Sequence, residues 1–266
     1  MSLQGLGMGW RPEIAGFVAG LPGLGFVEVI AESLPPQGLP WTLADLRDRD
    51  VAIVPHGVRL SLGGAEPVSA KRVARLADAA ELTGAPLVSE HIAFVRAGGL
   101  EAGHLLPLPR SWEAVHATVA NVRRTKDELP VPIALEPIAA LFDWPDDELT
   151  EAQFVTEILE RTDALLLLDV ANIYANAINR NLDPVSTLDG WPLERLAYVH
   201  IAGGRMSGGL YHDTHTDPVP RAVLDLLPAV KPPAVLLERD GDYPTGAELL
   251  AELDAIAAAA GFEEVT

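Results

Sequence analysis

The sequence predicts an α/β fold of the (β/α)8 TIM-barrel type, formed by a single domain over residues 1–266. Eight short apolar runs alternate with helical patterns along the whole chain. Division of the 266 residues by eight gives about 33 residues per unit, an ordinary length for a strand–helix repeat. The main alternative is a doubly wound open sheet, which usually carries a glycine-rich phosphate loop after an early strand. The sequence contains no such loop, so we expect a barrel.

The predicted strands are short apolar runs, several of them rich in Val, Ile and Leu, as expected for a parallel sheet covered by helices. They span Gly5–Trp10, Phe26–Ile30, Val51–His56, Pro86–Phe94, Pro132–Glu136, Leu165–Val170, Ala197–Ala202 and Ala234–Glu238.

The clearest predicted helices lie between these strands. They span Ser69–Thr83, Ser111–Glu128, Glu151–Arg161, Arg221–Val230 and Gly246–Ala260. Ser111 is suited to begin one helix, and Thr150 with Gln153 forms a Thr-x-x-Gln capping box at the start of another. We also expect helices after the first two strands and around Ala171–Arg180, where the pattern is less regular.

The composition excludes several classes of site and partner. The chain has no cysteine, which excludes disulfides, zinc–thiolate sites, iron–sulfur clusters and a catalytic thiol. Its formal net charge of −19 would repel a phosphate backbone, so we expect no nucleic-acid partner. The chain has no apolar run of roughly 20 residues and no signal peptide in its opening Met-Ser-Leu-Gln-Gly. We therefore expect an acidic, soluble, cytoplasmic protein without a membrane partner.

Polar residues occur at the ends of six predicted strands. These residues are His56, His91, Glu136, Asp169, His200 and Glu238. In an α/β barrel the C-terminal strand ends open onto one face, where groups from different strands converge. Any one of these residues alone is more simply explained as a hydrogen-bonded core residue or a helix cap. Six of them at six strand ends instead predict one site that holds three imidazoles and three carboxylates.

This combination of side chains predicts a metal centre. Three carboxylates in a partly buried site repel one another and require protonation or a cation. Imidazole and carboxylate together are a ligand set for Fe, Mn or Zn. Asp213 and His215 would point the same way in an extended segment, and Asn172 lies one helical turn beyond Asp169. At about three protein ligands per open catalytic site, these nine residues predict two or three ions.

Some of these residues have simpler explanations. Asp213 and His215 could also belong to a turn with solvated side chains. His104, His116 and His212 fit no metal-binding pattern, so we expect His116 on a helix face and the other two in loops.

Seven motifs, in this order along the chain, resemble those of the multinuclear non-haem iron-dependent oxidative enzymes (MNIO). That family includes the oxidases of methanobactin and 3-thiaglutamate biosynthesis. The motifs are His56-Gly-Val-Arg-Leu-Ser-Leu-Gly63, Ser89-Glu-His-Ile-Ala93, Leu105-Leu-Pro-Leu-Pro109, Leu166-Leu-Leu-Asp-Val-Ala-Asn-Ile-Tyr174, Val199-His-Ile-Ala-Gly203, Asp213-Thr-His215 and Leu237-Glu-Arg-Asp240. The resemblance extends from about Gly5 to the final helix.

The resemblance implies a xylose-isomerase-like barrel that binds two or three iron ions. The implied metal ligands are His56, His91, Glu136, Asp169, Asn172, His200, Asp213, His215 and Glu238. Asp240 would lie beside the cluster as a catalytic group, either a weaker ligand or one that orients a ligand. The family uses Fe2+ and Fe3+ with O2 as co-substrate to oxidise ribosomally made precursor peptides, often at cysteine. Many members work with a separate partner protein that binds the leader of the peptide.

The chain departs from the family pattern beside the implied ligands. Pro137 follows Glu136 where the family usually has Asn, and Ala171 precedes Asn172 where the family has a second Asn. Ser33, Arg180 and Gly204 likewise replace a typical Asn, His and His; all three changes leave the implied ligands in place. Residues around a metal site orient its ligands and tune the metal. The sequence therefore leaves the peptide, the exact modification and the choice between two and three irons open.

Three functions remain compatible with the sequence. The first is an iron- and O2-dependent oxidase that modifies a ribosomally synthesised precursor peptide. The second is a Zn- or Mn-dependent hydrolase or isomerase on the same type of barrel. The third is a binding protein that retains an inactive site. Buried carboxylates held together without a cation are costly, so an intact ligand set argues against the third function.

Overall fold

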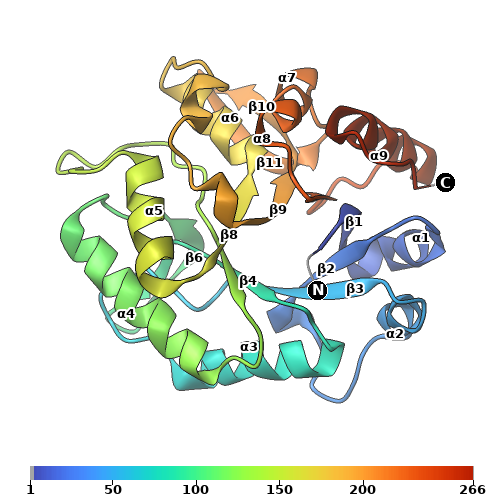
Figure 1. Ribbon diagram of the computed structural model, residues 1–266, viewed down its shortest axis with the longest axis horizontal. Helices are drawn as coiled ribbons and strands as arrows, with labels where there is room; N and C mark the ends of the chain where they lie inside the picture. The colour runs from blue at the N-terminus through green and yellow to red at the C-terminus, as the bar shows by residue number, and fades with distance from the viewer. Residues whose placement is uncertain (1–2, 266) are drawn as a thin grey trace.

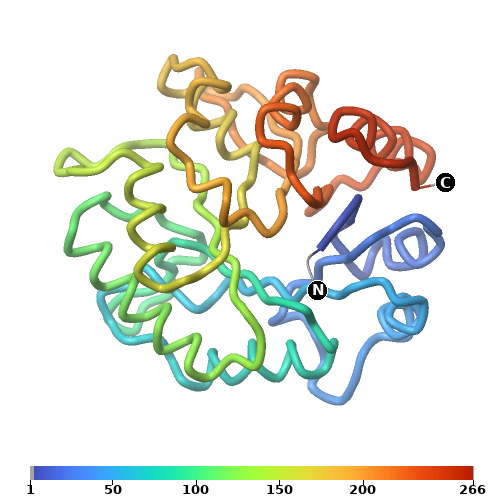
Figure 2. Tube along the Cα trace, viewed as in Figure 1, coloured from blue at the N-terminus to red at the C-terminus, as the bar shows by residue number. Residues whose placement is uncertain are grey.

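The computed structural model describes residues 3–265 and closes eight parallel strands into a barrel (Figures 1 and 2). Around the barrel these strands are β1 (Gly5–Trp10), β2 (Phe26–Ile30), β3 (Ala52–Gly57), β4 (Val88–His91), β7 (Ile133–Glu136), β8 (Leu165–Asp169), β9 (Leu196–Ile201) and β12 (Ala234–Leu237). Strand β12 pairs with β1, Gly5 opposite Ala234, and closes the ring. The predicted TIM barrel is confirmed. The prediction of one domain stays a prediction, and residues 1, 2 and 266, including part of the segment inspected for a signal peptide, lie outside the described residues.

Helices lie around the outside of the barrel (Figure 1). They are α1 (Ala15–Gly20), α2 (Trp41–Asp48), α3 (Ala70–Thr83), α4 (Trp112–Glu128), α5 (Glu151–Thr162), α6 (Val170–Asn179), α7 (Arg221–Leu224), α8 (Leu227–Val230) and α9 (Gly246–Ala260). Short 3-10 turns add Pro12–Ile14, Ala31–Ser33, Ser186–Leu188 and Leu193–Arg195. The two predicted helix starts are confirmed, because Ser111 accepts from the backbone of Ala114, and Thr150 and Gln153 form a reciprocal capping box. The helices expected after the first two strands are also present.

Two predicted elements are divided in the structure. The strand predicted over Pro86–Phe94 ends at His91, and Phe94 begins a separate antiparallel hairpin of β5 (Phe94–Ala97) and β6 (Leu100–Leu106). A turn at Gly98 and Gly99, with φ of 58° and 79°, makes this hairpin possible because glycine adopts positive φ without strain. The helix predicted over Arg221–Val230 is two short helices, because Pro228 has no N–H to continue the first one.

A second hairpin follows β9. Its strands are β10 (Gly203–Ser207) and β11 (Leu210–Asp217), and they carry Asp213 and His215. The segment is therefore paired and extended for most of its length, not a solvated loop. The backbone of His215 is not extended. Its φ is 55°, and the residue lies near the register shift of the hairpin.

The core has two parts. The larger part packs the barrel against its helices and includes Val73, Val115, Ile158 and Leu253. The smaller part fills the barrel interior with one side chain from almost every strand. It includes Phe26, Val54, Leu87, Ala134, Leu167, Tyr198 and Leu236. This apolar layer supports the polar side chains described below.

No helix in the stretch from residue 3 to residue 265 combines the length and apolar character needed to cross a membrane.

We expect Gly7→Ala to destabilise the barrel. A Cβ atom on Gly7 would lie 2.5 Å from the ring of Phe26, which is fully buried and packs edge-to-face on Tyr198. Overpacking of this kind costs about 1–3 kcal/mol of unfolding free energy, which urea denaturation measures. Gly16→Ala is the matched control, because Gly16 lies on α1 with no atom within 4 Å of the added Cβ. Equal stability of the two variants would contradict this packing account.

Candidate metal centre

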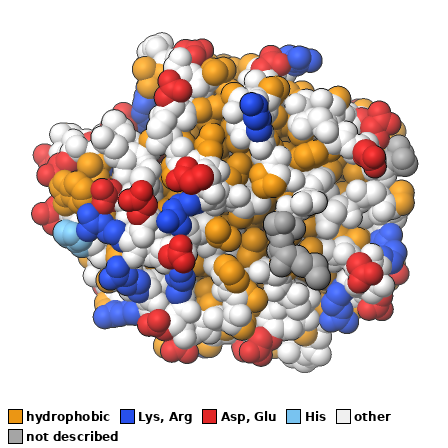
Figure 3. Space-filling view, in the orientation of Figure 1, with side chains coloured by type: hydrophobic (Ala, Val, Ile, Leu, Met, Phe, Trp, Pro, Cys, Tyr) orange, Lys and Arg blue, Asp and Glu red, His pale blue; other side chains and the backbone are white. Residues whose placement is uncertain are grey.

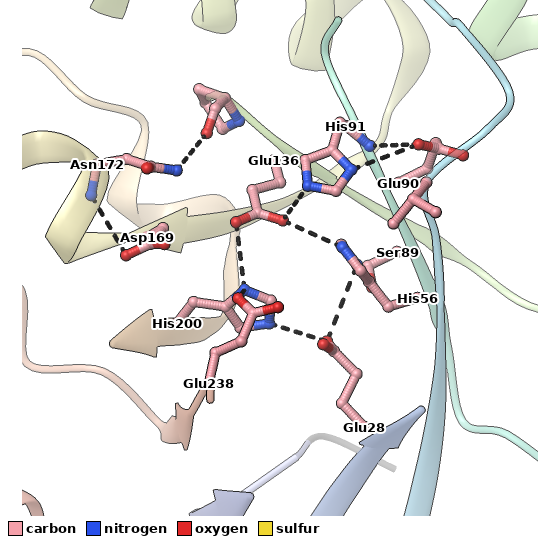
Figure 4. Close-up of polar contacts among 12 residues, drawn as sticks. Glu28, His56, Ser89, Glu90, His91, Glu136, Asp169, Asn172, His200 and Glu238 are labelled. Carbon is pink, nitrogen blue, oxygen red and sulfur yellow. Dashed lines mark hydrogen bonds and ion pairs between the residues drawn. The ribbon is translucent and has the colours of Figure 1, made fainter. Parts of the chain in front are cut away.

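A ring of polar side chains lies inside the barrel, directly on the C-terminal side of the apolar layer (Figure 4). Each member follows an apolar residue of that layer by two positions, along one strand or within one residue of its end, so both point into the barrel. The pairs are Phe26 and Glu28, Val54 and His56, Leu87 and Ser89, Ala134 and Glu136, Leu167 and Asp169, Tyr198 and His200, and Leu236 and Glu238. Strand alternation therefore gathers the chemistry at one level of the barrel.

His56, His91 and Glu136 form one group that can hold a metal ion. The Nε2 atoms of His56 and His91 lie 3.6 and 3.2 Å from the same carboxylate oxygen, Oε2 of Glu136. The two imidazole rings meet edge-to-face with their centroids 4.6 Å apart. Glu90 supports His91, because its Oε1 accepts from the backbone N–H of His91 and lies 3.5 Å from Nδ1 of that imidazole.

Glu136 also belongs to a second group, with Asp169, His200 and Glu238. Its other oxygen, Oε1, lies 3.2 Å from Nδ1 of His200, and Oε2 of Glu238 lies 3.1 Å from the same nitrogen. All four side chains are buried. Glu136 therefore offers one oxygen to each group, an arrangement in which a carboxylate can bridge two ions.

The β10–β11 hairpin completes the cluster from above. Asp169, Asp213 and His215 form a third group, and His215 forms a fourth with Glu238 and Asp240. Nε2 of His215 lies 2.6 Å from Asp213 and 3.6 Å from Asp169, and its Nδ1 lies 3.2 Å from Glu238. The expectation that Asp213 and His215 face the same way agrees with this geometry.

Asp169 and Asn172 are placed by the start of α6. Oδ1 of Asp169 accepts from the backbone N–H groups of Ala171 and Asn172, which leaves Oδ2 directed away from the helix. The amide nitrogen of Asn172 donates to the carbonyl of Pro137 at 3.2 Å, which leaves its Oδ1 uncommitted by that bond. The structure brings all nine predicted ligands to one region, and their ligation of a metal stays a prediction.

Several buried atoms of the cluster lack a hydrogen-bond partner within residues 3–265. They are Oε2 of Glu136, Oδ2 of Asp169, Oδ1 of Asp213 and Nδ1 of His91. Buried acceptors of this kind are costly without a donor or cation. Two of them, Oε2 of Glu136 and Oδ2 of Asp169, lie 3.2–3.6 Å from imidazole nitrogens. A donor set of imidazole and carboxylate fits Fe, Mn or Zn.

The protonation of the cluster reflects the same excess of negative charge. Burial would lower the pKa of His91, but the carboxylates of Glu136, Glu90 and Glu238 together outweigh it and raise the value to about 9. Burial would raise the pKa of Glu136, but His200 and His91 lower it to about 2. Burial, followed by repulsion from Asp213, raises the pKa of Asp169 well above its usual range. Protons on the histidines thus supply, in the metal-free protein, the positive charge that the carboxylates require.

A cavity of about 200 Å³ opens above the cluster. Its polar wall consists of cluster residues, including His91, Glu136 and His215, and its apolar wall is formed by Leu105, Ile138 and Ala139. A larger cavity of about 480 Å³ lies between α5 and the segment after α6, around Arg110, Arg180 and Trp191, and contains none of the cluster residues. The smaller cavity is therefore the one that gives access to the candidate metals.

Besides Glu90, sequence reasoning missed four residues that contact the cluster. Arg11 contacts Glu238 at 3.2 Å and Asp240 at 2.7 Å, so Asp240 lies beside the cluster as the resemblance implied. Glu28, Ser89 and Tyr198 lie fully buried below the histidines. The signal for Glu28 was a charged residue inside the run Phe26-Val-Glu-Val-Ile30, two positions after an interior aromatic residue.

Three histidines lie outside the cluster. His116 is exposed on α4, as predicted, whereas His104 and His212 lie on the hairpin strands β6 and β11 and not in loops. On the face of the molecule shown in Figure 3, acidic and basic side chains are interspersed among small groups of hydrophobic ones.

Comparison with known proteins gives a family and a set of relatives. A sequence model of the family described as "RiPP precursor modification enzyme MbnB/TglH/ChrH" matches residues 5–261, where RiPP denotes a ribosomally synthesised and post-translationally modified peptide. A UPF0276 protein of Streptomyces avermitilis is 52% identical over 263 residues, which cover 95% of this chain and 54% of that relative. A UPF0276 protein of Caulobacter vibrioides is 36% identical over 264 residues, 96% of this chain and 94% of the relative. The chain thus spans about half the length of the first relative.

Solved structures with the same fold are more distant. A 3-keto-D-glucoside 4-epimerase from E. coli has a TM-score of 0.59 at 15% identity, and the match covers 96% of this chain and 98% of that chain. Endonuclease IV from Thermus thermophilus has a TM-score of 0.57 at 19% identity, with 96% and 97% covered. A xylose isomerase domain protein from Planctomyces limnophilus has a TM-score of 0.59 at 14% identity, with 97% of both chains covered. These similarities show the xylose-isomerase-like barrel and nothing about activity.

The raised pKa of His91 predicts a pH-dependent contribution to stability in metal-free protein. A histidine whose folded pKa is about 9, against an ordinary value of 6.5, stabilises the fold fully below pH 6.5. That contribution is lost as the pH rises through 9. In the presence of a chelator, His91→Gln should therefore lower the unfolding free energy more at about pH 6 than at about pH 10. Denaturant titrations at both pH values measure the difference, and an equal loss at both would contradict the assigned charge.

Proposed function

We propose that this chain, which belongs to the MbnB/TglH/ChrH family of RiPP precursor modification enzymes, is an iron- and O2-dependent oxidase that modifies a ribosomally synthesised precursor peptide. Family membership supports the peptide substrate. The two histidine-containing groups that share Glu136 support a multinuclear centre of two or three ions. The proposal places the enzyme in the cytoplasm, where its ribosomally made substrate is produced.

The single observation that carries this proposal is the position of Glu136. One of its oxygens faces His56 and His91, and the other faces His200, each at 3.2–3.6 Å. A side chain that faces two nitrogen-containing groups in this way suits a pair of ions held at short distance. Iron supplies, when bound, the capacity to exchange electrons with O2. The carboxylates of Asp169 and Glu238 would hold the second ion together with His200.

The protein's own residues shape the space in which the peptide reacts. A cavity of about 200 Å³ accommodates one side chain of a peptide rather than a folded protein. Leu105, Ile138 and Ala139 exclude water from one wall of this cavity. Asp240, held by Arg11 and 3.6 Å from Nδ1 of His215, would orient that imidazole toward the centre. The chain contains no cysteine, so any thiol that enters the cavity is not supplied by this chain.

We also propose that a separate protein presents the peptide by binding its leader. The cavity admits a side chain but offers no long enclosed groove for a leader among its lining residues. The residues beside the ligands, such as Pro137 and Gly204, differ from those usual in the resembling family, so family membership does not fix the modified side chain or the product.

The second candidate function is a Zn- or Mn-dependent hydrolase or isomerase. Its support is the fold, because the similar solved structures include an epimerase, an isomerase domain protein and an endonuclease. The donor set of imidazole and carboxylate also accepts Zn or Mn. The family match favours the first function, since it concerns peptide modification and spans nearly the whole chain.

Metal analysis separates the two functions. We expect protein purified without O2 to contain at least two irons per chain, and to consume O2 only when its precursor peptide is added. Inductively coupled plasma mass spectrometry and an oxygen electrode give both quantities. Zinc or manganese as the sole bound metal, with turnover of a peptide or sugar in the absence of O2, would favour the second function.

His200→Ala should remove metal and activity together. Its Nδ1 meets Glu136 and Glu238, so its loss removes the only imidazole of the second group. We expect the variant to lose at least one ion per chain and to retain less than about 1% of the activity, as expected when a ligand of a catalytic metal is lost. His116→Ala, on the exposed face of α4, is the matched control and should retain both. Full iron content in His200→Ala would show that the ligand assignment is wrong.

A further inference from the structure

Five fully buried side chains form a continuous hydrogen-bonded path beneath the candidate metal centre. Four of them, Glu28, His56, Ser89 and His200, are labelled in Figure 4. Nδ1 of His56 lies 2.8 Å from Oγ of Ser89, and the hydroxyl of Tyr198 lies 2.8 Å from the same Oγ. The hydroxyl of Tyr198 also lies 2.5 Å from Oε2 of Glu28, and Nε2 of His200 lies 2.9 Å from that oxygen. The path therefore connects two predicted metal ligands on β3 and β9 through residues on β2, β4 and β9.

The donors and acceptors of this path leave one consistent arrangement of protons. A carboxylate can only accept, so Glu28 must accept from both Tyr198 and His200. The hydroxyl of Tyr198 has a single proton, which it donates to Glu28. In the contact with Ser89, the hydroxyl of Ser89 must therefore donate and the oxygen of Tyr198 must accept. Oγ of Ser89 is then free to accept from Nδ1–H of His56. Both ends of the path thus run toward the same carboxylate.

The direction of hydrogen-bond donation toward Glu28 determines which nitrogen of each imidazole is free to bind a metal. A neutral imidazole carries one proton, and the other nitrogen holds the lone pair that binds the ion. With its proton on Nε2, His200 presents the lone pair of Nδ1, the atom that faces Glu136 and Glu238. With its proton on Nδ1, His56 presents Nε2, the atom that faces Glu136. In both cases the free nitrogen is the one that the cluster requires.

We infer that Glu28 is a positioning residue that, through Tyr198 and Ser89, sets the tautomers of both His200 and His56 for metal binding. The inference rests on the proposed metal centre and goes beyond it, because Glu28 is not among the predicted ligands. Carboxylates that accept from a metal-bound histidine fix its orientation and raise its basicity. Here one carboxylate does so directly for His200 and, through Tyr198 and Ser89, indirectly for His56.

A purely space-filling role does not explain why position 28 carries a carboxylate. The residue is fully buried and its Oε1 has no hydrogen-bond partner within residues 3–265, so it is a costly way to fill the barrel. An apolar side chain at this position would fill the same space without desolvating a carboxylate. Oε2 of Glu28 accepts hydrogen bonds from Tyr198 and His200, and an apolar side chain could not accept either of them.

The test compares Glu28→Gln with wild-type protein. A glutamine keeps the size of the side chain but carries an NH2 group and no charge, so it no longer requires a proton on Nε2 of His200. We expect the affinity for Zn2+, measured by competition with a chromophoric chelator, to fall about 10- to 100-fold. Zn2+ is diamagnetic, so 15N spectra of the zinc-loaded protein also report which ring nitrogen carries the proton.

The spectra provide a readout that a structural role would not change. In wild-type protein we expect protonated Nε2 on His200 and protonated Nδ1 on His56, and in Glu28→Gln we expect the His200 signal to weaken or move. Tyr198→Phe, which removes only one hydroxyl, is the second test variant and replaces Glu28→Gln if that variant does not fold. It should preserve the His200 signal, because Glu28 still accepts from that imidazole, and alter the His56 signal.

Glu32→Gln is the matched control. Glu32 accepts from the backbone N–H of Val58 and makes no hydrogen bond to a histidine among the described residues. It should retain the wild-type affinity for Zn2+ and the wild-type spectrum. Equal affinity and identical 15N shifts in wild-type protein and Glu28→Gln would overturn the inference while leaving the metal centre in place. Wild-type protein that binds no ion would overturn the metal centre, and the inference with it.

Discussion

The organisation of this barrel depends on the contacts of one carboxylate, that of Glu136. It lies 3.2–3.6 Å from nitrogens of His56, His91 and His200, which come from three different strands. These contacts partly balance an excess of buried negative charge, because Asp169 and Glu238 add two more carboxylates to the same buried volume. Protons compensate for that charge in the metal-free protein, and cations would do so more fully. The cavity, the second hairpin and Arg11 are all arranged around this requirement.

Much of the site could be predicted from the sequence, because in a barrel a residue at the C-terminal end of a strand lies on a known face of the molecule. His56, Glu136 and His200 end apolar runs, and the strand ends of a closed barrel converge on one face. Glu28 could not be found in this way, because it lies inside its strand rather than at the end. Its role depends on which residues lie opposite it across the barrel, and that is a property of the closed ring rather than of any local pattern. The division of Pro86–Phe94 was missed because apolar residues, Ile92-Ala-Phe94, follow His91 with no Gly or Pro to separate the strand from the hairpin.

Fold and family support different parts of the account. Barrels with TM-scores near 0.6 and identities below 20% include epimerases and an endonuclease, so the architecture alone does not select a reaction. The family match, from residue 5 to residue 261, is the support for the proposed peptide modification. The relative from Streptomyces extends well beyond the region shared with this chain, which covers 54% of its length. The cluster residues therefore carry the mechanistic part of the proposal, and the substrate part comes from the family.

The most direct test of the central claim is anomalous diffraction at the iron absorption edge from crystals grown without O2. We expect at least two iron peaks, one within bonding distance of each carboxylate oxygen of Glu136, with His56 and His91 on one side and His200 on the other. Iron that avoids Glu136, or a barrel interior that contains no metal after loading with Fe2+, would contradict it.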